Sequence, residues 1–266
     1  MPDTAISPAL SDQARLRAFW NARYAHFSLS ESGWFGAGER LNERIYACKI
    51  QALGASLRAL GRRPRESFSV LDAGCGQGYF ARFYGSTFPA ARYVGIDISE
   101  RAVQHLQRAE PAAEFHVGDL TTWADLTGRR FDIVQSLEVL HLILDDDIFA
   151  GAIRNLGALL ADDGALLVTA ALPERTVERA GYLRYRSYDM WMETLRACGL
   201  AMVESRPIYY WLPAGGPSNR YWRHLFGRLG VDALYFADRA ALAIGLPHPR
   251  AIGLDCTMRL LTIRRA

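Results

Sequence analysis

Long apolar runs are missing from this 266-residue chain. No stretch reaches the roughly 18 consecutive apolar residues that a membrane-spanning helix needs, so the sequence predicts no such helix. Cysteine is scarce, and the four cysteines include no C-x-x-C pair, which is typical of free thiols in a reducing compartment. Residues 1–4 lack the basic start and the apolar core of a signal peptide. Together these absences predict a cytoplasmic protein.

An excess of charge of one sign is absent as well. The 31 basic and 28 acidic residues give a formal net charge of +3, which is too small to indicate nucleic acid or an anionic membrane as a partner. Half of the residues are apolar, so a chain of this length can bury a full core. We therefore expect one large domain with an insertion.

Three alternating glycines follow a short apolar segment near the middle of the N-terminal half. Residues 68–73 have the composition of a buried strand, and Gly74, Gly76 and Gly78 come directly after it, followed by a helix-like segment. Glycine lets the backbone turn sharply and approach a ligand, and a helix start offers unpaired N–H groups. This stretch predicts a nucleotide-like cofactor at the end of the strand.

The spacing of these glycines excludes two common nucleotide sites. The dinucleotide pattern G-x-G-x-x-G requires a third glycine one residue further on, where this chain has Tyr79. A phosphate-binding P-loop ends in Gly-Lys-Ser/Thr, and no such sequence closes this loop. The glycine loop is therefore neither an NAD motif nor a P-loop.

Acidic residues follow the next two expected strands. Residues 92–97 form a strand pattern that ends in Asp97, and residues 114–118 form another that is followed by Asp119. A carboxylate after the second strand of a βαβ unit is placed to accept hydrogen bonds from ribose hydroxyls. The alternative for Asp97 is a turn or cap residue, which is common for aspartate between a strand and a helix. Ser99 is expected to cap the helix that follows.

The sequence L-D-A-G-C-G-Q-G at residues 71–78, followed by two strand-end acids, resembles class I S-adenosylmethionine (SAM)-dependent methyltransferases of the small-molecule branch. The resemblance implies an α/β fold with a doubly wound, mostly parallel seven-stranded sheet and helices on both faces. It also implies SAM as cofactor and S-adenosylhomocysteine (SAH) as product, with the glycine loop at the methionine end and Asp119 at the adenine amino group. The residues expected to bind the cofactor are Tyr24, Trp34, Asp72, Gly74, Gly76, Gly78, Asp97, Ile98, Asp119, Leu120 and Ser136.

The end of the fourth strand, residues 131–136, faces the transferred methyl group in the resembled family. Methyltransferases of amide or adenine nitrogens commonly carry Asn/Asp-Pro-Pro-Tyr/Phe there, whereas this chain has Ser-Leu-Glu-Val, which disfavours that chemistry. The small-molecule branch often has V-L-x-H or V-L-H-H, and His141 matches the first histidine of the second form, with Leu142 in the other position. A general base is expected at His141. A partly buried loop histidine is the alternative.

The N-terminal 63 residues are expected to form a helical lid, and residues 64–266 the catalytic domain. The pattern Trp20, Arg23 and Tyr24, then a glycine-rich loop and a helix carrying Lys49, resembles the segment that covers the SAM pocket in some small methyltransferases. A packing helix with core aromatics is the alternative. The acids 145–147 are expected to cap a helix rather than bind a metal, because consecutive side chains at a helix start point apart.

An insertion of about residues 209–253 is expected between strands six and seven, over the carboxyl ends of the sheet. We interpret it as a cover over the pocket of a flat or apolar acceptor, with a dimer interface or a stacking helix as alternatives. The arginine- and tyrosine-containing residues 173–187 are either a carboxylate-binding segment or a solvated face. The aromatic residues of the insertion are Tyr209, Tyr210, Trp211, Tyr221, Trp222 and His224.

These observations predict a SAM-dependent methyltransferase that acts on the hydroxyl, carboxylate or amine of a small molecule, in natural-product or secondary metabolism. No nucleic acid, membrane or metal is expected, and a homodimer is compatible with the chain. One alternative is a SAM-binding protein of this fold with other chemistry. Another is a protein or nucleic-acid methyltransferase, which would need a basic tract or a recognition domain that is not evident.

Overall fold

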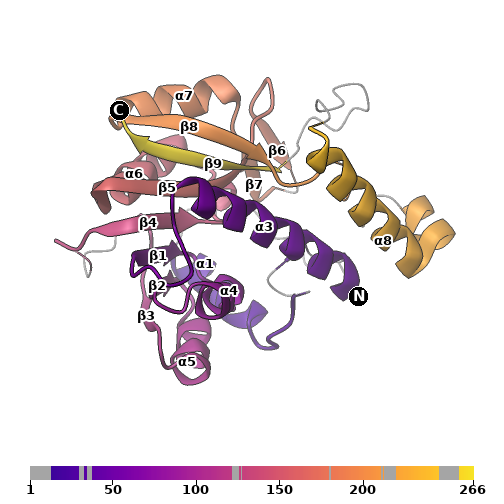
Figure 1. Ribbon diagram of the computed structural model, residues 1–266, viewed down its shortest axis with the longest axis horizontal. Coiled ribbons are helices and arrows are strands. Elements are labelled where there is room, and N and C mark those ends of the chain that lie inside the picture. Colours follow the sequence, from indigo (N-terminus) through magenta and orange to yellow (C-terminus); the bar gives the residue numbers. More distant parts are fainter. Residues whose placement is uncertain are drawn as a thin grey trace.

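The fold is a mixed, mostly parallel seven-stranded sheet in the order β3-β2-β1-β4-β5-β9-β8, which confirms the expected fold class (Figure 1). β1 to β5 pair in parallel, and β9 runs antiparallel to both β5 and β8. The computed structural model describes residues 13–29, 33–34, 38–121, 126, 128–179, 181–210, 212, 220–245 and 258–266. The strands are β1 (Ser69–Ala73), β2 (Arg92–Asp97), β3 (Glu114–Val117), β4 (Phe131–Ser136), β5 (Leu160–Ala171), β8 (Leu200–Pro207) and β9 (Met258–Arg265).

Helices cover both faces of this sheet because its central strands are apolar on both sides. Val70 of β1 belongs to one buried cluster, shared with α3, α4 and α5, whereas the next residue, Leu71, belongs to a second cluster, shared with α6 and α7. The described helices are α1 (Gln13–Arg23), α3 (Glu39–Ala59), α4 (Tyr79–Thr87), α5 (Glu100–Ala109), α6 (Asp146–Ala158), α7 (Tyr188–Ala197) and α8 (Arg220–Ala243), with a 3-10 turn η1 (Leu140–Leu142). No helix in the described part of the chain is long and apolar enough to cross a membrane.

Two helix caps follow the sequence expectation. The Ser99 hydroxyl accepts a hydrogen bond from the N–H of Ala102 at the start of α5. One Asp145 carboxylate oxygen accepts from the N–H groups of Asp147 and Ile148, both at 2.9 Å, at the start of α6. A cap satisfies donors that have no partner inside the helix. The acids at 145–147 therefore begin a helix, as expected.

The stretch 173–187 contains a small hairpin that the sequence pattern does not reveal. Its strands, β6 (Val177–Arg179) and β7 (Leu183–Tyr185), pair antiparallel outside the main sheet. Strands of three residues are too short to show an alternating pattern.

The insertion between β8 and β9 contains α8, which packs along α3 at the end of the molecule shown on the right in Figure 1. The Arg44 guanidinium donates to Asp232 at 2.7 Å and lies over the ring of Tyr235. Buried Asp238 accepts from the N–H groups of Tyr210 and Leu212, which joins α8 to the chain that leaves β8. Trp211 and the side chains of Tyr221, Trp222 and His224 lie outside the described residues. The role of the insertion as a cover and the domain boundary at residue 63 stay predictions.

Candidate active site

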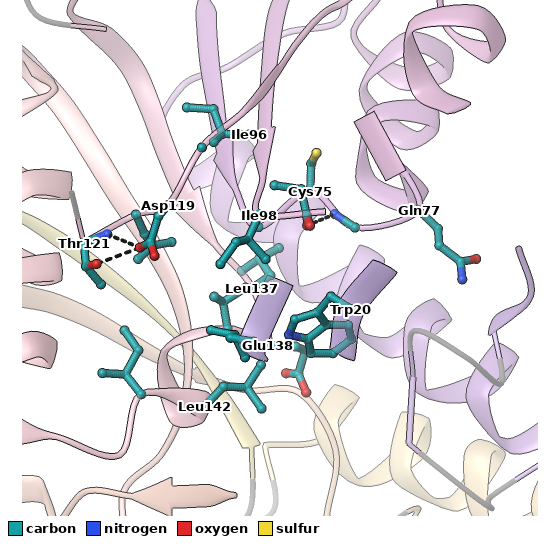
Figure 2. Close-up of a pocket in the computed structure, with 18 of the residues that line it drawn as sticks. Trp20, Cys75, Gln77, Ile96, Ile98, Asp119, Thr121, Leu137, Glu138 and Leu142 are labelled. Atoms are coloured by element: carbon teal, nitrogen blue, oxygen red, sulfur yellow. Dashed lines mark hydrogen bonds between the residues drawn. The ribbon is translucent and has the colours of Figure 1, made fainter. Parts of the chain in front are cut away.

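A cavity of about 450 Å³ lies at the carboxyl ends of β1, β2, β3 and β4 (Figure 2). Pockets for small organic ligands typically measure about 300–1,000 Å³. The lining residues are contributed by the four strand ends and by α1, α3, α4, η1 and α6. From the strand ends come residues 74–77, 96–98, 118–121 and 137–139; the other lining residues are Leu16, Trp20, Tyr24, Tyr46, Tyr79, Phe80, Leu142, Ile143, Leu144, Asp145 and Ile148.

The glycine loop after β1 forms one wall of the cavity. Gly74 has φ +89°, and a Cβ there would lie 2.3 Å from a methyl carbon of Val139. Gly78 has φ +71°, and a Cβ there would lie 2.3 Å from Leu106 of α5. Other residues rarely adopt this left-handed conformation, and no atom can occupy either position without displacing its neighbour. Both glycines are therefore required for the chain to turn from β1 into α4.

Asp97 lies at the end of β2 and connects this loop to the cavity. Its two carboxylate oxygens accept the N–H groups of Gly76, at 2.8 Å, and Ser99, at 2.9 Å. Burial raises the pKa of Asp97 to about 6, although these two hydrogen bonds favour the ionised form. Each carboxylate oxygen has a further lone pair for a ligand. Asp97 thus stabilises the turn through these hydrogen bonds, which is the alternative role given for it above. It also lines the cavity.

The far end of the cavity is formed by residues 118–121, after β3. One oxygen of Asp119 accepts from the N–H of Thr121 at 2.8 Å and from its hydroxyl at 2.7 Å. The other oxygen is left for a donor in the cavity. Ile98 and Leu120 line the same cavity and provide apolar surfaces on which a flat ring can lie.

Residues 70–164 match the model of the methyltransferase domain family. This segment of the chain belongs to that family. Curated relatives include a ubiquinone biosynthesis O-methyltransferase of Mesorhizobium japonicum, 26% identical over 63% of this chain and 55% of the relative. A trans-aconitate 2-methyltransferase of Paracidovorax citrulli is 34% identical over 41% of each chain. This chain thus spans about half of the length of these relatives.

Solved structures share the fold at low identity. The magnesium protoporphyrin IX methyltransferase from Synechocystis PCC 6803, with bound SAM, aligns with a TM-score of 0.58 over 98% of this chain and all of that one, at 18% identity. The cyclase SpnF aligns with a TM-score of 0.52 over 81% of each chain, at 19% identity. Proteins of different activity therefore share this architecture, and function has to be argued from the site.

Seven of the residues expected to touch a cofactor line the cavity, and four are not part of its lining. Asp72 is buried and accepts from the Tyr93 hydroxyl, and Ser136 donates to the carbonyl of Ala73 at 3.0 Å. Gly78 packs on α5, as described above. The side chain of Trp34 is exposed, and its backbone N–H donates to the side-chain oxygen of Asn42 at 2.7 Å. Those within the lining are Tyr24, Gly74, Gly76, Asp97, Ile98, Asp119 and Leu120, and their roles in binding stay predictions.

His141 points away from the main cavity. Its ring stacks on Tyr185 with 5.5 Å between centroids, and it belongs to a separate small pocket with Thr169 and Trp191. Burial lowers the pKa of His141 below its usual value, although nearby Glu138 opposes this shift. The neighbouring Leu142 lines the main cavity instead. A general-base role for His141 stays a prediction, and the described geometry does not bring its ring to the cavity lining.

The part of the N-terminal segment that is described does lie over the cavity. Trp20 of α1 and Tyr24, just after that helix, line it, with stacked rings whose centroids are 5.4 Å apart. The Asn21 side-chain oxygen accepts from the hydroxyl of Ser99 at 2.7 Å and from the N–H of Arg101. These bonds fix α1 to the start of α5. The role of this segment as a lid stays a prediction.

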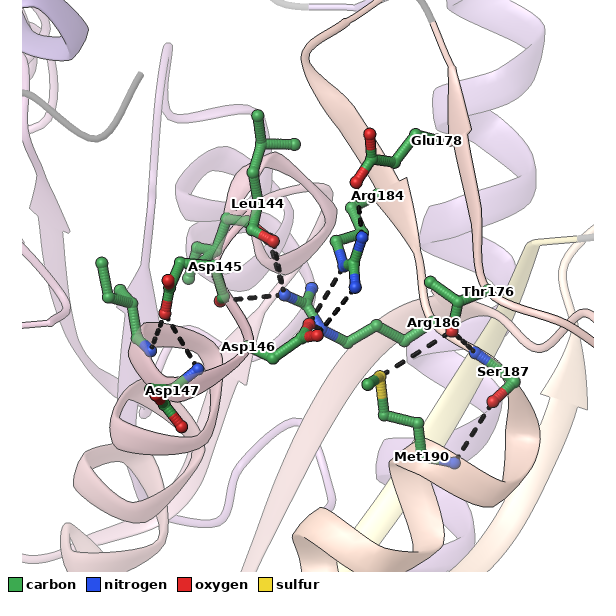
Figure 3. Close-up of polar contacts among 12 residues, drawn as sticks. Leu144, Asp145, Asp146, Asp147, Thr176, Glu178, Arg184, Arg186, Ser187 and Met190 are labelled. Atoms are coloured by element: carbon green, nitrogen blue, oxygen red, sulfur yellow. Dashed lines mark hydrogen bonds and ion pairs between the residues drawn. The ribbon is translucent and has the colours of Figure 1, made fainter. Parts of the chain in front are cut away.

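A buried arginine holds the opposite wall of the cavity (Figure 3). Arg186, with a side chain 1% exposed, donates to Asp146 at 2.9 Å and to the carbonyls of Ile143 and Asp145 at 2.9 and 3.0 Å. Arg184 pairs with the same Asp146 at 2.7 Å and with Glu178. Both guanidinium groups are thus bonded within the protein, and they connect the β6–β7 hairpin to cavity residues 143–145.

Proposed function

We propose that this protein transfers the methyl group of SAM to a small-molecule acceptor. The observation that carries the proposal is the meeting of the glycine loop, Asp97 and Asp119 on one cavity, at the ends of adjoining parallel strands. Homologous structures hold SAM or SAH. Because the curated relatives are only partly covered by this chain, the activity is proposed here from the site itself.

The residues present fit SAM. The loop at Gly74 and Gly76 leaves room for the methionine end, Asp97 offers acceptors to ribose hydroxyls, and Asp119 offers one to an exocyclic amine. Every charged residue in the described lining is acidic, which suits a ligand that carries a sulfonium and an ammonium group. These acids are Asp97, Asp119, Glu138 and Asp145.

Bound SAM supplies a methyl group that is electrophilic because its sulfur is positively charged. The protein's part is then to orient the two reactants and to exclude water. Asp97, held by the N–H groups of Gly76 and Ser99, orients the cofactor without moving itself. Trp20 of α1 and Tyr24 just after it close the cavity and keep solvent away.

Replacement of Asp97 by asparagine tests the cofactor site. Loss of charge-assisted hydrogen bonds to ribose should weaken SAM and SAH binding by about 10- to 100-fold. Isothermal titration calorimetry measures both affinities, and circular dichroism verifies the fold. Asp163→Asn, at an exposed position of β5, is the matched control and should bind like the wild type. Wild-type protein that is folded and binds neither SAM nor SAH would refute the proposed function.

The affinity for SAM should depend on pH through Asp97. Its carboxyl has a pKa of about 6, raised by burial, and only the ionised form accepts from both ribose hydroxyls. Below that pH the proton has to be lost on binding, so the affinity should fall by about tenfold per pH unit, whereas it should level off at higher pH. Calorimetry between about pH 5 and about pH 8 measures this dependence. In Asp97→Asn this fall in SAM affinity at low pH should disappear. An unchanged pH dependence of the affinity in that variant would show that another group titrates.

A protein of this fold that binds SAM without moving its methyl group is the second candidate, since the cyclase SpnF shares the architecture. Release of SAH in the presence of small acceptors separates the two. Methylation confined to a protein or nucleic acid would identify the other alternative. The homodimer and the cytoplasmic location stay predictions from the sequence.

A further inference from the structure

Glu138 has an unusual backbone conformation beside the cavity. It is the one residue other than glycine with positive φ, 66°, in the described part of the chain. Its N–H donates to the Thr169 hydroxyl on β5 at 2.6 Å. Such a conformation is costly and persists only where the surroundings impose it, often at functional sites. The backbone after β4 is thus held in a shape that sets the direction of this side chain.

The single lysine of the sequence fixes the carboxylate of Glu138. Lys49 of α3 is 4% exposed, and its ammonium lies 3.3 Å from Oε2 of Glu138 and 4.5 Å from the centre of the Tyr46 ring. Burial raises the pKa of Glu138, but the positive charge of Lys49, together with His141 and the Thr169 hydroxyl, holds that pKa below its usual value. Glu138 is therefore ionised at neutral pH.

The second carboxylate oxygen of Glu138 has no donor among the described residues. This oxygen, Oε1, is buried. A buried charged oxygen without a donor is destabilising, so such atoms normally have one. The Glu138 side chain is 25% exposed and lines the cavity (Figure 2). In that view it lies away from Asp119 and Thr121, which form the proposed adenine end.

The charges around Glu138 disfavour an anionic acceptor. Lys49 approaches from the protein side and is not part of the described lining, which contains acidic residues and no arginine or lysine. Arg184 and Arg186, which could have bound a carboxylate, are bonded to Asp146 and to the backbone. An acceptor carboxylate beside Glu138 would meet like charge, and no arginine or lysine of the described lining would offset that repulsion.

From these observations we propose that Glu138 accepts a hydrogen bond from the methyl acceptor and so selects hydroxyl or amine acceptors over carboxylates. The proposal rests on the proposed function and narrows its substrate class. Trp20, Tyr46 and Tyr79 line the cavity with Glu138, and their rings suit an uncharged, flat or apolar body on the acceptor. A carboxylate acceptor is the excluded class.

Matched probes test this selection: catechol against benzoate, and 1-decanol and decylamine against decanoate. With radiolabelled SAM at saturation, the hydroxyl or amine member should exceed its carboxylate counterpart in kcat/KM by about a hundredfold. Glu138→Gln should lower that kcat/KM by about tenfold or more, mostly through KM, and reduce the discrimination against carboxylates. Because SAH lacks the sulfonium, its affinity by calorimetry should fall less than kcat/KM for the acceptor does. Exposed Glu193→Gln is the control and should change neither value.

A second variant keeps the test decisive if Glu138→Gln does not fold. Glu138→Asp retains the charge that pairs with Lys49 and tolerates positive φ, but its carboxylate is one methylene shorter. It should lose activity on the hydroxyl or amine probe while still rejecting carboxylates. Equal or better methylation of a carboxylate probe, or no transfer to any probe by protein that binds SAM, would overturn the inference and leave SAM binding intact. If the folded wild-type protein bound neither SAM nor SAH, that result would instead refute the proposed function.

Discussion

Replacement of Gly74 by alanine is expected to weaken SAM binding by about a hundredfold or more and to destabilise the fold by about 1–3 kcal/mol. The backbone at Gly74 has φ +89°, and a methyl group there would lie 2.3 Å from Val139. Val139 follows Glu138 and lines the cavity, so relief of the clash has to move the cavity wall. Calorimetry with SAM and urea denaturation measure the two effects.

Gly85 provides the matched control for that experiment. It lies within α4, the helix that follows the same loop, and a Cβ there meets no atom within 4 Å. Gly85→Ala should therefore stabilise the protein by up to about 1 kcal/mol through helix propensity and leave SAM affinity unchanged. If Gly74→Ala behaved like Gly85→Ala, the close approach of the glycine loop to Val139 would be wrong.

The second large effect is expected at Arg186. Its change to leucine should destabilise the protein by about 3–5 kcal/mol, because it removes a buried guanidinium and leaves its partners without donors. These partners are Asp146 and the carbonyls of Ile143 and Asp145. Since residues 143–145 line the cavity, SAM affinity should fall as well. Urea denaturation gives the free energy of unfolding, and calorimetry gives the affinity.

A variant of Arg184 separates the effect of burial from the effect of charge on the stability loss expected at Arg186. Its side chain is 22% exposed and pairs with the same Asp146, so Arg184→Leu removes an equal charge from a wetter position. The expected loss is only about 1 kcal/mol, as for ion pairs near the surface. Equal losses for the two variants would show that Arg186 owes its effect to charge alone, and would contradict its assignment as the anchor of the cavity wall.

The sequence predicted the parts of this protein that depend on neighbours along the chain. Residues 131–136 form β4 as expected, Ser99 and Asp145 cap helices as expected, and Asp97 lies in the cavity after an apolar strand. In each case a short pattern determines the local structure, and parallel strands bring their carboxyl ends to one edge of the sheet.

Features that depend on distant segments were not predictable in the same way. The N–H of Glu138 donates to Thr169 on β5 and its carboxylate pairs with Lys49 on α3, and nothing in the local sequence reveals either partner. His141 shows the same limit. It lies in a 3-10 turn, where neighbouring side chains point in different directions, so Leu142 lines the cavity and His141 packs on Tyr185.

The burial of Lys49 has a practical consequence for measuring motion in this protein. Lys49 carries the one ε-amine of this sequence that an acylating reagent could modify. In the folded protein this amine is buried between Glu138 and the Tyr46 ring. A labelled Lys49 peptide in mass spectrometry would therefore count the molecules in which α3 has opened away from the end of β4. The chain carries its own chemical reporter of that opening, with no introduced probe.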